Sequence, residues 1–312
     1  MNQMYVPTFQ GLGVGDFARS VGNRPTTYPF DAKHQVRFYR ARNAIYHLFR
    51  TLRADDRRLT ALVPDYNSGN EVLAMRAAGV TIQHYPVGPD GQIDPSVVEQ
   101  FCNRYDPDVL YVIHYLGWPQ PMWELTRLCR ERRVLLVEDC ALALLSALDG
   151  RPLGSFGDWA VYCLYKTLPV PNGAILVQNT TRVEALEQLP LHRATVASDA
   201  GRTAELFVQR IRSRLNGVGG ALQFIKRSVG RAATALDVKR ATVGDIGFAL
   251  GDVDLAMSSI STHLLGRLDF DAIRQTRVQN FRQLADLLDG RASVWHRELA
   301  DGVGVLGSGH EG

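Results

Sequence analysis

Two adjacent carboxylates, Glu138 and Asp139, directly follow the apolar run at residues 134–137. A carboxylate at the end of a buried strand is costly to remove from water unless a cation meets it. One cation that would serve is the protonated ring nitrogen of a bound cofactor. The alternative is that Asp139 caps a helix or pairs with a local arginine, and the residues alone leave both interpretations open.

A lysine, Lys166, ends the apolar run at residues 160–165 and precedes the segment Thr-Leu-Pro-Val-Pro-Asn-Gly. Burial lowers the pKa of a lysine amine, which suits it to covalent chemistry with a carbonyl group. Lysine is otherwise scarce, since Lys33, Lys226 and Lys239 are the only others in a chain rich in arginine. Lys166 therefore indicates amine chemistry, and a surface lysine is the simpler alternative.

A helix is predicted to begin at Ala41-Arg42-Asn43. Free backbone N–H groups at a helix start attract anions, and the Arg42 guanidinium adds donors suited to phosphate. No glycine-rich Walker or dinucleotide motif occurs in the sequence, which disfavours a nucleoside triphosphatase and a Rossmann dehydrogenase. The eight histidines show no HExxH-like spacing, so no metal site is predicted.

The composition is that of an ordinary globular protein. Of 312 residues, 46% are hydrophobic and 21% are charged, and the net charge of +3 gives no reason to expect nucleic-acid binding. The N-terminus lacks a signal-peptide pattern and the apolar runs have strand length, which predicts a cytoplasmic protein without membrane contact. The cysteines are too scattered for a disulfide framework or a zinc site: Cys102, Cys129, Cys140 and Cys163.

Short apolar segments alternate with amphipathic ones between residues 36 and 190. Helical periodicity runs from Val36 and Phe38 to Leu52, and further helices are predicted over 69–78, from Asp94-Pro95 onward, and over 121–132. Strands are predicted over 59–64, 81–87, 109–115, 134–138, 160–165 and 173–178. This alternation predicts an α/β fold with a parallel sheet covered on both faces, and ligands of such sheets bind beyond the carboxyl ends of the strands.

The segment 205–231 has a different character, because arginines and lysines stand among apolar residues and glycines interrupt it. One interpretation is a basic amphipathic surface that contacts anionic lipid or an acidic partner. The simpler alternative is an ordinary helical pair with a solvated arginine face and a glycine turn. A long helix is predicted over 270–289, and the glycine-rich end of the chain has no apolar core.

Taken in order, the chain resembles the DegT/DnrJ/EryC1/StrS family of PLP-dependent sugar aminotransferases, which have fold type I. The resemblance covers about 36–190 and, more weakly, 255–289. The segments that carry it are VPDYNSGNEVLAMRAAGV, VIHYLGWPQPMWELTRLCRERRVLLVEDCALAL and DGRPLGSFGDWAVYCLYKTLPVPNGAILV.

The resemblance implies roles for single residues. Lys166 matches the lysine that binds pyridoxal 5'-phosphate (PLP) covalently and moves the proton at the substrate carbon. Asp139 matches the acid that keeps the pyridine nitrogen protonated, which makes the ring an electron sink. Arg42 and Asn43 match the turn that cradles the phosphate, and Cys163 stands where relatives usually carry a serine near the phosphate.

Further residues are implied around the cofactor. His114 and Tyr115 would line the strand end beside it. Ser68 falls near the position of an aromatic side chain that commonly stacks on the ring, and Tyr66 is close to that position. Relatives often place Gln or His at the position of Leu142, to contact the phenolic oxygen of the cofactor, and Ala41 replaces a common glycine.

The family pattern also implies a domain organisation. Residues 1–35 would be an N-terminal arm and 36–195 the PLP-binding α/β domain. Residues 196–254 would be a basic helical insertion and 255–312 a partial C-terminal small domain, because complete relatives continue further.

The leading hypothesis is a PLP-dependent aminotransferase that moves an amino group from an amino-acid donor to a keto group, by resemblance on a nucleotide-linked sugar. The family active site lies between two subunits, so a homodimer is expected. One alternative is a PLP-dependent sugar dehydratase, which Lys166 disfavours because such relatives often lack the lysine. Another is a non-catalytic PLP-fold protein that binds a partner, which the departures at Leu142 and Ala41 favour.

Overall fold

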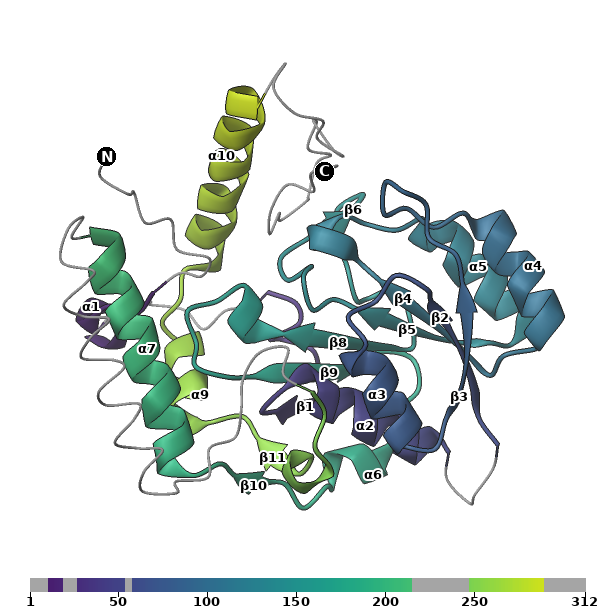
Figure 1. Ribbon diagram of the computed structural model, residues 1–312, viewed down its shortest axis with the longest axis horizontal. Coiled ribbons are helices and arrows are strands. Elements are labelled where there is room, and N and C mark those ends of the chain that lie inside the picture. Colours follow the sequence, from purple (N-terminus) through teal and green to yellow (C-terminus); the bar gives the residue numbers. More distant parts are fainter. Residues whose placement is uncertain (1–10, 19–26, 54–57, 215–246, 289–312) are drawn as a thin grey trace.

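A nine-stranded sheet, in the order β10-β11-β1-β9-β8-β5-β4-β2-β3, organises the chain (Figure 1). The computed structural model describes residues 11–18, 27–53, 58–214 and 247–288. The strands of the sheet are β1 (Gln35–Phe38), β2 (Thr60–Pro64), β3 (Thr81–Tyr85), β4 (Val109–Ile113), β5 (Leu135–Asp139), β8 (Trp159–Cys163), β9 (Ala174–Gln178), β10 (His192–Arg193) and β11 (Leu255–Ala256). Strands β6 (Ala147–Leu148) and β7 (Arg151–Pro152) form a separate pair.

The sheet is parallel from β3 to β8 and changes direction at its other side. Strands β3, β2, β4, β5 and β8 pair in parallel, whereas β9 is antiparallel to β8 and β1 is antiparallel to β9. The central strands are buried along their whole length, as expected for strands covered on both faces. The predicted α/β fold with a mainly parallel sheet is confirmed.

Alternate residues of each strand enter two different hydrophobic clusters. On β4 and β5, Tyr111 and Val137 belong to one cluster, and Leu110 and Leu136 belong to the other. The first face packs against α2 (Ala41–Leu52), α3 (Asn70–Ala77) and α6 (Glu184–Glu187). The second face packs against α4 (Pro95–Tyr105), α5 (Met122–Arg132), α7 (Val196–Arg214) and α9 (Ser259–Leu265).

The predicted helical periodicity was wrong at its beginning. Val36 and Phe38 belong to β1, and the helix begins only at Ala41. Both residues are buried at a spacing of two, which is the period of a strand, and β1 pairs with β9 through four residues. Apolar residues on the end of the strand and on the following helix therefore imitated one continuous helical pattern.

Local signals predicted helix boundaries correctly. Helix α3 ends before Gly79, which has a φ of +83°. The Asp94 side chain caps α4 by accepting a hydrogen bond from the Ser96 N–H, with Pro95 at the first helical position. The N–H of Gly91 donates to Gly88 O and closes the predicted turn.

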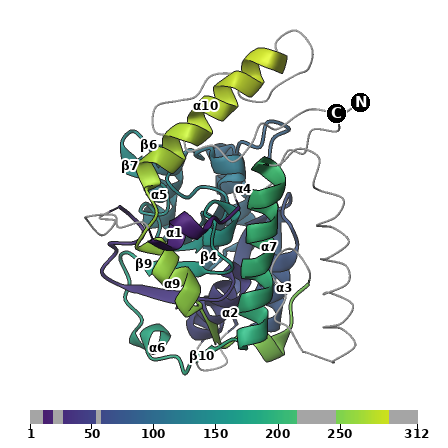
Figure 2. The same ribbon diagram turned by 90° about the vertical axis from the view of Figure 1, so that its left-hand side faces the viewer.

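The long helices after β10 pack beside the sheet or extend away from it. Helix α7 covers the side of the sheet near α9, and α10 (Phe270–Leu288) extends away from it in both views (Figures 1 and 2). A short helix near the N-terminus, α1 (Val14–Ala18), packs against α9 on this side, whereas a 3-10 turn, η4 (Leu250–Asp252), lies beside the start of α2. Residues 215–231 of the basic segment lie outside the described residues, and the domain boundaries stay predictions. None of the described helices is both long and apolar enough to cross a membrane.

Candidate active site

The predicted site residues lie at one edge of the sheet, because the carboxyl ends of β2, β4, β5 and β8 are neighbours. Strand β1 runs in the same direction as β8, since each is antiparallel to β9 between them, so α2 also begins at this edge. The residues that the topology brings to this edge are Arg42, Tyr66, Ser68, His114, Tyr115, Asp139 and Lys166.

Asp139 is the last residue of β5 and is almost fully buried. Its Oδ2 accepts a hydrogen bond of 2.6 Å from the Tyr111 hydroxyl, and its Oδ1 accepts one of 2.9 Å from the Ala141 N–H. Burial, and next the charge of Glu71, raise the pKa of the Asp139 carboxyl, while Lys166 and both hydrogen bonds act against this shift. The Asp139 carboxylate thus has both a local backbone donor, the Ala141 N–H, and a nearby cation, Lys166.

Lys166 ends a 3-10 turn, η3 (Leu164–Lys166), directly after β8. Its positive charge acts against the rise in pKa of Asp139 and also of Cys163, so the amine lies within electrostatic reach of both groups. Burial raises the pKa of the Cys163 thiol to about 11, which keeps the thiol neutral at physiological pH.

Hydrogen bonds hold the loop that carries Lys166 on both sides of the lysine. At its start, the Leu164 N–H donates to Gly173 O at 2.9 Å. Immediately after the lysine, Thr167 O accepts a hydrogen bond of 3.0 Å from Arg277 Nη2 on α10. The last helix of the described chain therefore contacts the residue next to the predicted catalytic lysine.

Asn172, just past the lysine, joins this loop to two helices, α7 and α9. Its Nδ2 donates to Asp199 Oδ1 of α7 at 2.9 Å, and its Oδ1 accepts from the Ser258 N–H at 3.0 Å. Its backbone oxygen accepts a hydrogen bond of 2.7 Å from the Ser261 hydroxyl of α9. Asn172, Ser258 and Ser261 are all buried, so this network fixes the end of the loop against α7 and α9.

Glu138, next to Asp139, points to the opposite face of the sheet and is fully buried. Its two oxygens accept hydrogen bonds of 2.6–2.8 Å from the N–H groups of Gly154, Phe156 and Gly157. The fourth partner is His114, whose Nε2 lies 3.1 Å from Glu138 Oε2. On the sequence alone, a buried carboxylate is expected to need a cation. At Glu138, four hydrogen-bond donors of the protein stabilise the carboxylate instead.

His114 is a buried member of this network. Its Nδ1 accepts a hydrogen bond of 3.3 Å from the Gln120 N–H, so the Nε2 carries the proton that it donates to Glu138. Cys140 lies close enough to complete a His-Cys-Glu group of the residue types that bind metals. Because hydrogen bonds from the chain already occupy both oxygens of Glu138, this group has the chemistry of a structural network.

Arg42 and Asn43 lie in the first turn of α2, and both are buried. Arg42 Nη1 donates to Asn70 Oδ1 at 3.3 Å. Asn43 Nδ2 donates to the backbone oxygen of Asp252 at 2.7 Å, and the Asp252 side chain forms an ion pair of 3.0 Å with Arg40. Asn43 therefore fastens α2 to the 252–254 segment.

Tyr66 and Tyr115 form the outer part of the site. The Tyr115 hydroxyl donates to the backbone oxygen of Tyr66 at 2.5 Å, and the two ring centroids are 5.4 Å apart. The Tyr66 side chain is 61% exposed, so one aromatic ring is open to solvent at the strand end. The N–H and hydroxyl of Ser68 both donate to the Glu71 carboxylate, at 2.8 and 2.5 Å.

Two residues near Asp139 were not predicted from the sequence. Tyr111 is the one polar side chain within the otherwise aliphatic strand β4, and that was its signal. Glu71 is buried at the start of α3, and the Ser-x-x-Glu spacing from Ser68 marks it as a helix-start residue. Their effect on Asp139 follows only from the pairing of distant segments.

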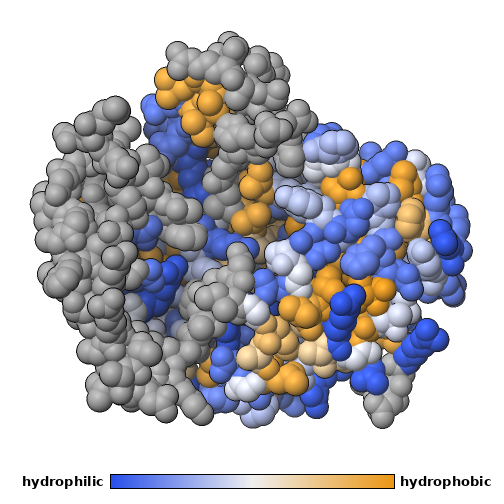
Figure 3. All heavy atoms as spheres, viewed as in Figure 1, coloured by the Kyte–Doolittle hydropathy of each residue, from blue (hydrophilic) through white to orange (hydrophobic). Residues whose placement is uncertain are grey.

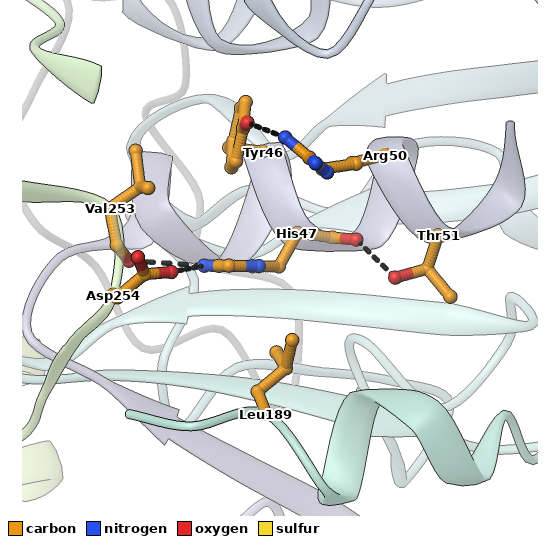
Figure 4. A pocket seen from close by; sticks show the side chains of 7 residues that line it. All are labelled: Tyr46, His47, Arg50, Thr51, Leu189, Val253 and Asp254. Carbon is orange, nitrogen blue, oxygen red and sulfur yellow. Dashed lines mark hydrogen bonds and ion pairs between the residues drawn. The ribbon is translucent and has the colours of Figure 1, made fainter. Parts of the chain in front are cut away.

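A pocket of about 380 Å³ lies along the other end of α2 (Figure 4). It shares no lining residue with the strand-end site. In it, His47 Nε2 lies 3.1 Å from Asp254 Oδ1 and 3.2 Å from the backbone oxygen of Val253. Arg50 Nη1 donates to the Tyr46 hydroxyl at 2.6 Å. This pocket adjoins the segment to which α2 is fastened.

Curated relatives match only in part. A GDP-perosamine synthase of Vibrio cholerae is 30% identical over 95 residues, which are 30% of this chain and 26% of that protein. A UDP-4-amino-4,6-dideoxy-N-acetyl-beta-L-altrosamine transaminase of Campylobacter jejuni is 23% identical over 120 residues, which are 37% of this chain and 32% of that protein. The chain thus matches about a quarter to a third of the length of these relatives.

The fold matches solved structures over nearly the whole chain. Helicobacter pylori PseC, an aminotransferase involved in the biosynthesis of pseudoaminic acid, has a TM-score of 0.63 at 15% identity, and the match covers 97% of this chain and 76% of that one. The model of the DegT/DnrJ/EryC1/StrS aminotransferase family matches residues 66–223, about half of the chain, including Asp139 and Lys166. The chain therefore belongs to the DegT/DnrJ/EryC1/StrS aminotransferase family.

Proposed function

We propose that this chain is a PLP-dependent aminotransferase whose key residues are Lys166 and Asp139. The observation that carries the proposal is that both groups lie at one edge of the sheet. An amine and a buried carboxylate there lie within electrostatic reach of each other. An amine can bind a carbonyl covalently, and a buried carboxylate can hold a protonated ring nitrogen.

The residues present fit this cofactor. The raised pKa of Asp139 reflects a desolvated carboxyl, and a cationic ring nitrogen would offset that cost. The start of α2 carries the positive end of a helix dipole, which suits a phosphate. The buried Arg42 guanidinium lies in the same turn. Partners for the ring nitrogen and for the phosphate are therefore both at this edge.

When bound, PLP supplies an electron sink. Asp139 would hold a positive charge at the ring nitrogen, and its two oxygens accept hydrogen bonds from the Tyr111 hydroxyl and the Ala141 N–H. The Lys166 amine moves the proton at the substrate carbon that bears nitrogen. Tyr66 and Tyr115 would lie against the ring or the substrate, and Cys163, as a neutral thiol, would lie near the phosphate side.

We infer the substrate class from the relatives. The two curated matches are named as a GDP-sugar synthase and a UDP-sugar transaminase. We therefore propose a keto group on a nucleotide-linked sugar as the acceptor and glutamate or glutamine as the donor. A homodimer is part of the proposal, because Tyr66 and Leu73 are exposed on and beside α3, where hydrophobic residues gather on the surface in Figure 3.

The test follows the visible absorbance of PLP-loaded protein after addition of L-glutamate. We expect loss of the cofactor band in the wild-type chain and transfer to a keto-sugar acceptor in a second step. Lys166→Ala should lower turnover by at least about 10³-fold, since it removes the proton-moving group. Lys33→Ala is the matched control, because Lys33 is exposed and distant in sequence from the site.

Normal turnover by Lys166→Ala would contradict the proposal. A folded wild-type chain that binds no PLP would favour the non-catalytic alternative, to which the departures at Leu142 and Ala41 point. Release of water from the sugar without amino transfer would favour the dehydratase alternative.

A further inference from the structure

Tyr111 is a fully buried tyrosine whose hydroxyl ends on a carboxylate. It lies on β4, opposite Val137 of β5 in the parallel register, two residues before the position opposite Asp139. Strand pleating places Tyr111 and Asp139 on the same face of the sheet, so the phenol reaches the carboxylate along that face. The resulting bond of 2.6 Å has the length of a charge-assisted O–H···O hydrogen bond.

Two donors fix both oxygens of this carboxylate. The Ala141 N–H holds Oδ1 from the Asp139 side of the chain, and the Tyr111 hydroxyl holds Oδ2 from the neighbouring strand. A carboxylate held at both oxygens cannot rotate freely. Each oxygen keeps further lone pairs for another donor.

The geometry points to Tyr111 as a positioning residue of the proposed function: its hydroxyl holds the Asp139 carboxylate ionised and in one orientation for the ring nitrogen of PLP. This inference rests on the proposed function. It assigns to Tyr111 a role that acts through Asp139, without contact to the cofactor.

The charged and titratable groups around Asp139 act in both directions. Glu71 of α3 disfavours ionisation of Asp139, and Lys166 after β8 favours it. Ionised Asp139 in turn opposes loss of the proton by the surrounding phenols and thiols, which are those of Tyr111, Tyr115, Cys140 and Cys163. Against the burial of Asp139 and the charge of Glu71, the Tyr111 hydroxyl is a neutral group that favours the anion.

The experiment compares Tyr111→Phe with Tyr85→Phe in the full chain. Tyr85 is a matched control, since it is equally buried and its hydroxyl donates to the backbone oxygen of Tyr111 instead of to Asp139. The dissociation constant of PLP is measured against pH by absorbance titration. Loss of the donor makes Asp139 easier to protonate, so the acid limb of binding should move to higher pH by about one unit in Tyr111→Phe. Tyr85→Phe should leave the limb in place.

A second readout uses the cofactor-free chain. The free energy of unfolding in urea is measured against pH for the wild type, Tyr111→Phe, Asp139→Asn and the double variant. The destabilisation by Tyr111→Phe should grow as pH rises through the range where Asp139 ionises, because only the anion gains the charge-assisted bond. In the Asp139→Asn background, the destabilisation should be independent of pH.

The possible results separate the role of Tyr111 from the proposed function. If wild-type protein binds PLP and Tyr111→Phe follows the wild-type pH profile, the inference is overturned and the proposed function stands. The inference is equally overturned if the destabilisation by Tyr111→Phe has the same pH dependence with and without Asp139, as a merely structural tyrosine would give. If the wild type binds no PLP, the proposed function and the role of Tyr111 toward it both fail.

Discussion

Glu138 and Asp139 are neighbours in sequence, and the two faces of the sheet treat them differently. Glu138 lies on the face of α4 and α5, where three backbone N–H groups and His114 supply four donors to its carboxylate. Asp139 lies on the face of α2, with one phenol and one backbone N–H. The pleat of a single strand thus separates a carboxylate used by the fold from one that can serve a ligand.

The two carboxylates at the end of β5 therefore have different roles, one in the fold and one at the proposed site. Donors from the 154–157 loop stabilise Glu138, so the loop after β7 is fixed relative to β5 and β8. Fewer donors of the chain stabilise Asp139, and burial raises the pKa of its carboxyl. Near a site, burial without full internal pairing indicates a partner from outside the chain.

Of the changes that test this comparison, we expect Glu138→Ala to have the largest effect on stability. This change leaves three buried N–H groups and His114 without their acceptor, so we expect a loss of about 3–5 kcal/mol in the free energy of unfolding. Urea denaturation of the cofactor-free chain measures it. Glu131→Ala, at an exposed glutamate on α5, is the control and should cost less than about 0.5 kcal/mol. Equal losses at the two positions would contradict the structural role of Glu138.

In contrast to Glu138→Ala, Asp139→Asn should weaken PLP binding without lowering the free energy of unfolding. Removing a desolvated charge leaves the free energy of unfolding at neutral pH equal or higher, because the pKa of Asp139 is raised by folding and stability is therefore lost as pH rises from the ordinary carboxyl pKa through the raised one. The PLP dissociation constant should rise about 10–100-fold, the value of a hydrogen bond between charged groups. A titration that gives wild-type affinity would show that Asp139 does not face the cofactor.

Leu142→Gln sharpens the comparison at a position three residues after Asp139. By resemblance, a glutamine here contacts the phenolic oxygen of PLP, and one added hydrogen bond of about 1 kcal/mol corresponds to about fivefold tighter binding. Leu142→Ala, which adds no donor, is the control. Weaker PLP binding by Leu142→Gln than by the control would argue that Leu142 lies away from the ring.

His47 offers the smallest effect, at the far end of α2. Burial lowers its pKa despite the nearby Asp254, so the folded chain prefers the neutral ring. The unfolded chain binds the proton more readily, so this contribution to stability is lost as pH falls below about 6.5. His47→Asn should flatten that part of the profile of unfolding free energy against pH, without changing PLP binding. An unchanged slope would show that His47 does not titrate there.

Much of the fold could be predicted from local patterns. The apolar run at 109–113 and the segment 135–139 are strands that are buried on both faces. Gly79 marks a helix end by its backbone conformation, and Asp94 marks a helix start by its side-chain cap. The error at Val36 and Phe38 arose where a strand and a helix share one apolar face. Local periodicity cannot separate the two when they meet within a few residues.

The positions of Lys166 and Asp139 at one edge followed from strand ends, but their surroundings did not. The Asp252 contact with Asn43 spans 209 residues, and the Ser261 contact with Asn172 spans 89. Such pairs depend on how the chain returns to the sheet, which no local pattern encodes. The contact of Tyr111 with Asp139 was not predicted for the same reason, because the two residues lie on different strands.

The most direct test of Lys166 as the cofactor-binding residue is reduction of PLP-loaded wild-type protein with borohydride, followed by peptide mapping. The chain contains only four lysines, so the site of attachment is unambiguous. We predict a visible band that disappears on reduction and a pyridoxyl group on the peptide that contains Lys166. A pyridoxyl group only on Lys33, Lys226 or Lys239, or a folded protein with no visible band, would contradict this prediction.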